Sequence, residues 1–290
     1  MKIAVIGGAG GMGQWLLKYF KRQGHNLVVS DVNGEKAYLT AKTVGGRLAE
    51  NNKDAVMSAD LVVVSVPVES TSRVIDEVSS NMNVGSVLME VASVKEPIIQ
   101  SLKAAAKHGL RPMSIHPLFG PGAEKLENLR IALIPVAEPA FEEGFVREIF
   151  PGADIVVVDA DRHDRMMAIV LSLPYFVNLA LAATIAEEDL GLLKRLSGTT
   201  FTMQLLIMES ILSQDTQLHT SIHFNNKETE NFLEKFMRQA DGLKALINKQ
   251  DKRSFEEFYE AARRNLRHDK DFLTAYRRMY ILLEKLANLE

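Results

Sequence analysis

Short apolar runs, most of them rich in β-branched residues, alternate with amphipathic stretches over residues 1–160. Runs that are apolar on both faces suit the strands of a parallel sheet that is covered by helices on both sides. The stretches between them have the lengths of crossover helices, so the pattern predicts a doubly wound α/β domain over residues 1–160. The predicted strands cover Ile3–Ile6, Leu27–Ser30, Leu61–Val66, Val87–Met89, Ile131–Ile134 and Ile155–Val158.

Residues 161–290 carry a different pattern, in which apolar residues recur at helical spacing, as at Phe255, Phe258 and Ala262. This spacing predicts an all-helical second domain over residues 161–290. The segment Ser254–Glu257 reads S-F-E-E, a capping box, and predicts that one of these helices starts there.

One segment of the helical half, Met166–Ala186, contains no charged residue and is long enough to cross a bilayer. It includes the polar residues Ser172 and Asn178 and also Pro174, and no other segment resembles a membrane span. A helix buried on all sides by protein is therefore predicted, and a membrane span is the less favoured alternative.

The composition narrows the class of protein. The chain has 34 basic and 37 acidic side chains, a net charge of −3, so no nucleic-acid or anionic-membrane partner is expected. A content of 47% hydrophobic and 24% charged residues is typical of a folded globular chain. The absence of cysteine excludes disulfides, thiolate metal sites and a cysteine nucleophile. The apolar run at the start is too short for a signal peptide, and a cytoplasmic location is expected.

A glycine-rich turn follows the first predicted strand. Residues Gly8–Gly13 match the pattern G-x-G-x-x-G, between that strand and a predicted helix that ends near Gly24. In Rossmann-type domains these glycines permit a tight turn, close approach of a pyrophosphate and close packing of helix on strand. A turn needed only for packing is the alternative. The predicted cofactor-binding residues here are Gly8, Gly10, Gly11, Met12 and Gly13.

Asp31 ends the second predicted strand, where an acid can bond both hydroxyls of a ribose. A carboxylate there repels a 2′-phosphate, so the sequence predicts NAD as the cofactor rather than NADP; capping of the next helix is the alternative role. Ser65, Val66 and Pro67 end another predicted strand at the same edge and are expected to face the cofactor, although an ordinary strand end has the same pattern.

His116 follows the strand-like segment Pro112–Ile115 and precedes a loop rich in proline and glycine. A histidine on the edge where the cofactor is expected is a candidate proton acceptor, because its ordinary pKa is near neutrality. A histidine in a surface loop is the alternative.

The segment Ser114–Pro121 closely resembles the H-P-M-F-G-P segment of prephenate dehydrogenases. Other segments resemble the same family in the same order, so that the resemblance runs from Met1 to about Asn226. These segments are Val64–Pro67, Ala92–Lys95, Arg162–Asp164 and Gln214–Leu218.

The resemblance implies an NAD-dependent dehydrogenase of tyrosine biosynthesis that converts a small molecule, prephenate, to 4-hydroxyphenylpyruvate by oxidative decarboxylation. His116 would accept a hydrogen bond from the ring hydroxyl, and Ser93 would bond the same hydroxyl or orient His116. His163 would either line the cleft between the domains or lie exposed at a helix start. The family's helical domain also implies a homodimer in which the partner buries Met166–Ala186. The expected substrate-binding residues are Lys95, Gly120, Ser210 and His219.

The resemblance fails at two basic positions of the family. The arginine that clamps the ring carboxylate aligns with Ser210, and a second arginine aligns with Thr202. A buried dianion needs a cationic partner, so either another cation substitutes or the substrate differs. The alternatives are arogenate, a related hydroxy acid, or a regulatory paralogue that binds the cofactor without turnover. The candidate cations are Lys95, Lys125, Arg130, Arg165 and Arg195, with Arg263, Arg264 and Arg267 from a partner subunit.

His219 and His223 have i, i+4 spacing, but no acidic ligand accompanies them, so no metal site is predicted.

Overall fold

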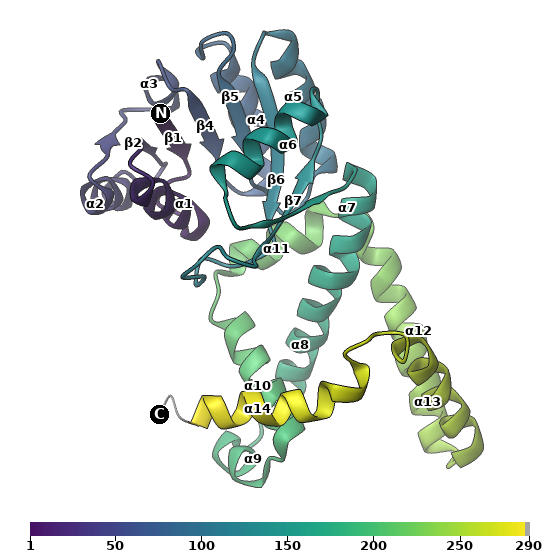
Figure 1. The fold of residues 1–290 in the computed structure, drawn as a ribbon. Coiled ribbons are helices and arrows are strands. Elements are labelled where there is room, and N and C mark those ends of the chain that lie inside the picture. The colour runs from purple at the N-terminus through teal and green to yellow at the C-terminus, as the bar shows by residue number, and fades with distance from the viewer. Residues whose placement is uncertain (288–290) are drawn as a thin grey trace. The chain divides into compact units, whose positions relative to one another are not determined.

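The computed structural model describes residues 1–287, and the chain divides into two units (Figure 1). The first unit contains Met1–Ala168 and Gln217–Lys227, and the second contains Ile169–Thr216 and the chain from Glu228 onward. The first unit thus extends beyond residue 160 and takes up a short segment of the helical half. That segment carries His219, one of the predicted site residues.

The first unit is built on an eight-stranded sheet in the order β3-β2-β1-β4-β5-β6-β7-β8. Neighbouring strands are parallel except β6 and β7, which are antiparallel and are joined by a loop without a helix. A parallel pair would need a crossover, usually a helix. The strands are β1 (Lys2–Ile6), β2 (Asn26–Ser30), β3 (Arg47–Leu48), β4 (Leu61–Val64), β5 (Val87–Glu90), β6 (Arg111–Pro117), β7 (Arg130–Ile134) and β8 (Asp154–Val157).

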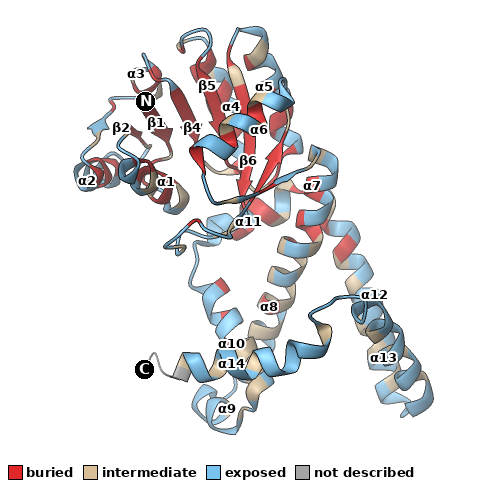
Figure 2. Ribbon diagram, in the orientation of Figure 1, coloured by how far each residue is buried: buried red, intermediate tan, exposed pale blue. Residues whose placement is uncertain are grey.

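Two hydrophobic cores cover the two faces of the sheet, whose central strands are buried (Figure 2). Successive side chains of a strand point to opposite faces, so Ile3 and Val5 of β1 join one core while Ala4 and Ile6 join the other. The first core lies under α1 (Gly11–Arg22), α2 (Gly34–Val44) and α6 (Pro139–Ile149), and the second under α3 (Asn52–Val56), α4 (Val68–Ser79) and α5 (Glu96–Lys107). Two further helices, α7 (Ala160–Met167) and α11 (Thr216–Asn225), contribute to this unit.

The second unit consists of helices and their connections over its described residues. The predicted start of a helix at the Ser254 capping box is wrong, because α13 begins at Lys252. Asp251 is its N-cap, and the carboxylate of Asp251 accepts a hydrogen bond from the Ser254 amide at 3.1 Å. The helices are α8 (Leu173–Thr184), α9 (Leu190–Leu196), α10 (Thr199–Leu212), α12 (Thr229–Asn248), α13 (Lys252–Leu266), a 3₁₀ turn (Phe272–Thr274) and α14 (Ala275–Ala287).

The apolar segment Met166–Ala186 is helical, but a π-helical turn at Ala168–Ser172 separates α7 from α8. Only 22% of its most apolar stretch is buried in the single chain. The predicted burial on all sides is therefore wrong for the chain by itself, because its neighbours α10 and α12 leave much of α8 uncovered. Within residues 1–287, Ala160–Thr184 is the one helix with the length and composition to cross a membrane.

Candidate active site

The turn between β1 and α1 is fixed by its backbone contacts. Gly7 has a φ of +78°, a left-handed conformation that glycine adopts without strain, and a Cβ there would lie 2.2 Å from the carbonyl oxygen of Ser65. The amides of Gly7 and Gly8 donate to the carbonyl of Ser30 at 2.9 and 3.0 Å. The turn therefore lies between the ends of β2 and β4.

Gly13 allows α1 to pack closely on this turn, because a Cβ at Gly13 would lie 2.2 Å from the carbonyl oxygen of Gly7. Gly10, the N-cap of α1, and Gly11, its first residue, are exposed, and the first turn of the helix holds no acidic side chain. Met12 is half-buried against the core. Bare backbone at a helix start without acidic side chains fits the phosphates of a dinucleotide, which need N–H donors and a positive dipole end.

Asp31 lies directly after β2, and backbone amides bind both of its carboxylate oxygens. Its Oδ2 accepts a hydrogen bond from the amide of Ala9 at 3.0 Å, and its Oδ1 accepts from the amide of Asn33 at 2.9 Å. The cap of α2 is Asn33, whose side chain accepts from the amide of Lys36. Asp31 therefore does not cap α2, and its contact with Ala9 joins it to the glycine turn.

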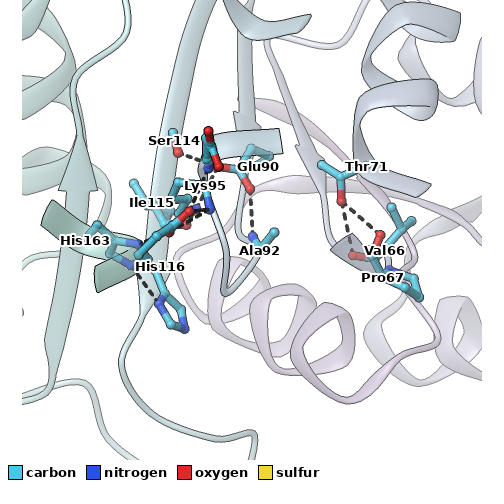
Figure 3. Close-up of polar contacts among 12 residues, drawn as sticks. Val66, Pro67, Thr71, Glu90, Ala92, Lys95, Ser114, Ile115, His116 and His163 are labelled. Atoms are coloured by element: carbon cyan, nitrogen blue, oxygen red, sulfur yellow. Dashed lines mark hydrogen bonds and ion pairs between the residues drawn. The ribbon is translucent and has the colours of Figure 1, made fainter. Parts of the chain in front are cut away.

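Ser65, Val66 and Pro67 follow β4 and are half-buried next to the glycine turn. The amide of Ser65 donates to the carbonyl of Ile6 at 2.8 Å, which extends the pairing of β4 with β1. The hydroxyl of Thr71 donates to the carbonyls of Val66 and Pro67 at 3.4 and 3.1 Å (Figure 3). The segment is thus fixed at both of its ends.

A fully buried ion pair joins the two ends of the loop between β5 and α5, because Glu90 ends β5 and Lys95 directly precedes α5 (Figure 3). The Nζ of Lys95 lies 2.7 Å from Oε1 of Glu90 and donates to the carbonyl of Ile115 at 2.6 Å. The hydroxyl of Ser114 also donates to Oε1 of Glu90, and the amide of Ala92 donates to its Oε2 at 2.7 Å. Burial lowers the pKa of Lys95, and the charge of Glu90 opposes this shift.

Lys95 consequently joins the loop to β6. Both side chains of the ion pair have 0% exposure, so the structure gives no support to the expected contact between Lys95 and a substrate carboxylate. Ser93 lies half-buried in the middle of the loop. The amides of Ala92 and Lys95, on either side of Ser93, are both bound to carboxylates, which fixes the backbone that carries its hydroxyl.

His116, near the end of β6, begins a chain of contacts that continues into α7. Its Nδ1 lies 3.0 Å from Nε2 of His163 (Figure 3), and Nδ1 of His163 lies 2.8 Å from Oδ1 of Asp164. The carboxylate of Asp164 also accepts hydrogen bonds from the amides of Lys95 and Glu96, at 2.9 and 2.8 Å. His163 is 1% exposed, so the interpretation of it as an exposed histidine at a helix start is wrong.

Both histidines are held in the neutral form near neutral pH. Burial lowers the pKa of His116 well below its ordinary value of 6.5, and the charge of Lys95, with that of His163 when its ring is protonated, lowers it further. Burial also lowers the pKa of His163, although the hydrogen bond to Asp164 opposes that shift. A neutral imidazole has one nitrogen that carries hydrogen and one that can accept a proton.

Helix α11 brings part of the helical half to the first unit. The hydroxyl of Ser221 accepts from the amide of Val68, at the start of α4, at 3.3 Å. Directly after α11, the side-chain amide of Asn226 donates to the carbonyl of Asp164 at 2.7 Å. The segment thus contacts both the start of α4 and α7, and it carries His219 as a buried residue.

The remaining two predicted substrate-binding residues belong to other elements. Gly120 is exposed in the loop after β6, where a Cβ would meet no atom within 4 Å, so packing does not require glycine there. Ser210 lies exposed in α10 of the second unit, and its hydroxyl donates to the carbonyl of Ile207 at 2.9 Å.

Several residues of this arrangement were not among the predicted site residues, and the main ones are Gly7, Glu90 and Asp164. Glu90 was detectable as a charged residue at the end of an otherwise apolar strand, and Asp164 as the neighbour of His163 in a segment that carries the family resemblance. Gly7 directly precedes the motif. Their partners come from elements far apart in the chain, which a local pattern does not specify.

The mostly parallel sheet, the glycine turn beside Asp31 and the buried histidine at a strand end define a dinucleotide-binding protein with a helical second domain. The family model of the prephenate dehydrogenase nucleotide-binding domain matches residues 16–137, and that of the prephenate dehydrogenase dimerization domain matches residues 159–261. The chain belongs to the prephenate dehydrogenase family, as the sequence motifs predicted.

Two curated relatives illustrate the range of names in the family. A probable arogenate/prephenate dehydrogenase of Methanocaldococcus jannaschii is 28% identical over 90% of this chain and 60% of its own length. A 4-amino-4-deoxyprephenate dehydrogenase of Streptomyces pristinaespiralis is 26% identical over 78% of this chain and 77% of its own length. The chain spans only 60%, 64% and 66% of three of the curated relatives it matches.

Solved structures show the same fold. Prephenate dehydrogenase from A. aeolicus, in complex with hydroxyphenyl propionate and NAD+, matches with a TM-score of 0.74 and 20% identity over 93% of this chain and 98% of that one. Synechocystis arogenate dehydrogenase matches with a TM-score of 0.67 and 20% identity, over 91% and 98%. These likenesses confirm the predicted fold class, an N-terminal Rossmann-type sheet followed by a helical domain.

Proposed function

We propose that the protein is an NAD-dependent dehydrogenase that converts prephenate to 4-hydroxyphenylpyruvate by oxidative decarboxylation. The observation that carries the proposal is the buried, neutral His116, whose Nδ1 is engaged by His163 and whose Nε2 remains for a substrate hydroxyl. Among residues 1–287, no hydrogen bond to that Nε2 is found. Membership of the prephenate dehydrogenase family supports the same reaction.

The glycine turn and Asp31 are the residues that would hold the cofactor. The exposed backbone at Gly10 and Gly11 suits the pyrophosphate, and the Asp31 carboxylate suits the two hydroxyls of a ribose. The same carboxylate disfavours a 2′-phosphate by like charge, which supports NAD over NADP. When bound, NAD supplies the acceptor for the hydride that leaves the hydroxyl-bearing carbon.

His116 acts on the hydroxyl of the same carbon. Its Nε2 accepts the hydroxyl proton while the carbon–oxygen bond gains double-bond character, and Ser93 donates to or accepts from the same oxygen. The bond to the ring carboxylate then breaks, CO₂ leaves, and the electron pair of that bond completes the aromatic ring. His116 returns its proton to the oxygen, which gives the phenol. One hydride and one CO₂ leave the substrate, and no net proton is released.

Arogenate is the second candidate substrate, because the Methanocaldococcus jannaschii relative carries both names. Both substrates have the ring carboxylate that the family arginine would bind, so Ser210 and Thr202 do not separate them. A regulatory protein that binds NAD without turnover is the candidate from another class, favoured by the loss of that arginine.

We also propose that the protein is a homodimer assembled through the second unit. The dimerization-domain model matches residues 159–261, and helix α10 exposes Leu206, Ile207 and Leu212. Apolar side chains on a helix that its own chain leaves uncovered are typical of an interface. Much of α8 is also uncovered, so the partner helices are expected to pack against it.

Steady-state formation of NADH, measured with prephenate and arogenate side by side and with NADP as a second cofactor, tests the proposed reaction. Turnover of prephenate with NAD, and much weaker turnover with NADP, is expected. Turnover of arogenate alone would identify arogenate, and not prephenate, as the substrate. NAD binding without turnover of either substrate would favour the regulatory alternative.

A further inference from the structure

The hydrogens in the chain of contacts from Asp164 to His116 can be assigned from its fixed end. Two backbone amides, those of Lys95 and Glu96, point at the carboxylate of Asp164 at 2.8 to 3.1 Å. An amide only donates, so Asp164 serves as an acceptor here. The atom that faces its Oδ1 at 2.8 Å, Nδ1 of His163, must therefore carry a hydrogen.

The position of the hydrogen on His163 determines its position on His116. A neutral His163 with hydrogen on Nδ1 has its lone pair on Nε2. That lone pair faces Nδ1 of His116 at 3.0 Å, so the hydrogen of His116 lies on Nδ1. The lone pair of His116 is then on Nε2, the nitrogen that the contact with His163 leaves available.

We infer that His163 and Asp164 are positioning residues that fix His116 in the Nδ1–H tautomer, so that its Nε2 can accept a proton. The use of that proton transfer in catalysis rests on the proposed function, whereas the tautomer of His116 does not. A protonated His163 would donate to His116 and impose the reverse tautomer, in which Nε2 carries hydrogen and accepts nothing. Burial of His163, at 1% exposure, disfavours that form.

Asp164 joins this chain to the loop that carries Ser93. It binds the first amides of α5, where no side chain of the helix's own start makes a cap. One carboxylate therefore orients both His163 and the end of the Ser93 loop. It also lies where it can stabilise positive charge that develops on His116 and spreads to His163 when the proton is taken.

The two ring nitrogens of each histidine can be distinguished by NMR of the full chain labelled with ¹⁵N-histidine, without substrate or cofactor. The His116 signals are assigned by their loss in His116→Asn. In the wild type we expect His116 as the Nδ1–H tautomer. His108, exposed at the end of α5, provides the reference for a solvated ring in the same spectra. A His116 signal with hydrogen on Nε2 would overturn the inference.

Two substitutions of His163 separate its hydrogen bonds from its packing, because both fill similar space and only one can form hydrogen bonds. His163→Gln retains an oxygen that can accept from Nδ1 of His116 and an amide that can donate to Asp164. His163→Leu fills similar space with neither group. We expect His116 to keep its tautomer in the glutamine variant and to shift toward Nε2–H in the leucine variant. An unchanged His116 tautomer in a folded leucine variant would contradict the inference. If that variant does not fold, the wild-type and glutamine spectra decide.

Kinetics supply a second readout once a substrate is in hand. The wrong tautomer affects the proton transfer, so His163→Leu should lower kcat by about 100-fold or more, with little change in KM, and His163→Gln should recover most of the loss. Equal losses in both variants would indicate a structural role only. Because the NMR measurement needs no turnover, failure of the proposed reaction and failure of this inference are distinguishable.

Discussion

His116 combines burial with a proposed role that requires it to accept a proton. Burial normally makes a base weaker, since the charged form loses its hydration. The contact with His163 and the nearby carboxylate of Asp164 provide polar partners in place of water. Burial therefore keeps His116 neutral, and able to accept a proton, below the ordinary histidine pKa of 6.5.

This environment predicts the pH dependence of turnover. In the proposed reaction His116 must be neutral to accept the hydroxyl proton, and burial, Lys95 and His163 all lower its pKa below 6.5. The rate should therefore be level above pH 6.5 and should fall only on the acid side of that value. His116→Asn should lower turnover by roughly 10²- to 10⁴-fold with little change in NAD affinity. A rate that titrates at or above pH 6.5, or a near-normal asparagine variant, would contradict the assignment of His116.

The contact of α1 with the glycine turn sets the shape of the proposed phosphate site. Substitution Gly13→Ala places a methyl group 2.2 Å from the carbonyl oxygen of Gly7, where backbone must move. We expect a loss of about 1–3 kcal/mol in the free energy of unfolding, the usual cost of overpacking, together with weaker NAD binding.

A matched control for this substitution is Gly34→Ala. Gly34 is the first residue of α2, where a Cβ meets no atom within 4 Å, so the free energy of unfolding and the NAD affinity should hardly change. Chemical denaturation and calorimetric titration measure both quantities. Equal behaviour of the two alanine variants would contradict the packing role of Gly13.

The contact between His116 of β6 and His163 of α7 predicts that the stability of the fold depends on pH. Folding lowers the pKa values of His116 and His163, so below pH 6.5 the unfolded chain binds more protons than the folded chain. The free energy of unfolding should therefore fall as the pH falls through 6.5, by at most about 1.4 kcal/mol per pH unit for each histidine, until the folded pKa is reached.

The groups that face these histidines, Lys95, Asp164 and Glu90, shift the folded pKa values and so help to set the pH at which this loss ends. Urea unfolding at a series of pH values measures the slope, and His163→Gln should make it shallower because one of the two histidines is removed. A free energy of unfolding that rises on acidification below pH 6.5 would contradict the lowered pKa values.

The sequence predicted the elements better than their contacts. The strand runs, the glycine turn and the helix that ends before Gly24 were recognised because they follow from local periodicity and turn chemistry. The contact of His116 with His163 spans 47 positions of the chain, and no local pattern encodes it. The start of α13 was misplaced because Asp251 and Ser254 are both good caps, and the structure uses the earlier one.

The uncovered apolar residues of the second unit predict a dimer. Leu206, Ile207 and Leu212 of α10 are each more than a third exposed. The exposure of these apolar side chains to water is unfavourable, and a partner surface removes it. Light scattering should give twice the chain mass of 32.3 kDa. Leu206→Glu should favour the monomer, whereas Val84→Glu, at an exposed position of the first unit, should not. A wild-type monomer at micromolar concentration would contradict the proposed assembly.

The family motifs predicted the fold class, which is confirmed, and His116 as the catalytic base, which stays a prediction, yet they left the substrate open at Ser210 and Thr202. The chain has no arginine at either position, and motif spacing does not indicate which other side chain binds a substrate carboxylate.

The most direct test of the proposed reaction is its stoichiometry with prephenate labelled in the ring carboxylate. The purified protein, mixed with NAD and limiting labelled prephenate, should release labelled CO₂ and form NADH in equal amounts. His116→Asn should slow both products together. Labelled CO₂ without NADH, NADH without labelled CO₂, or neither product despite bound NAD would contradict the proposal that this chain carries out oxidative decarboxylation.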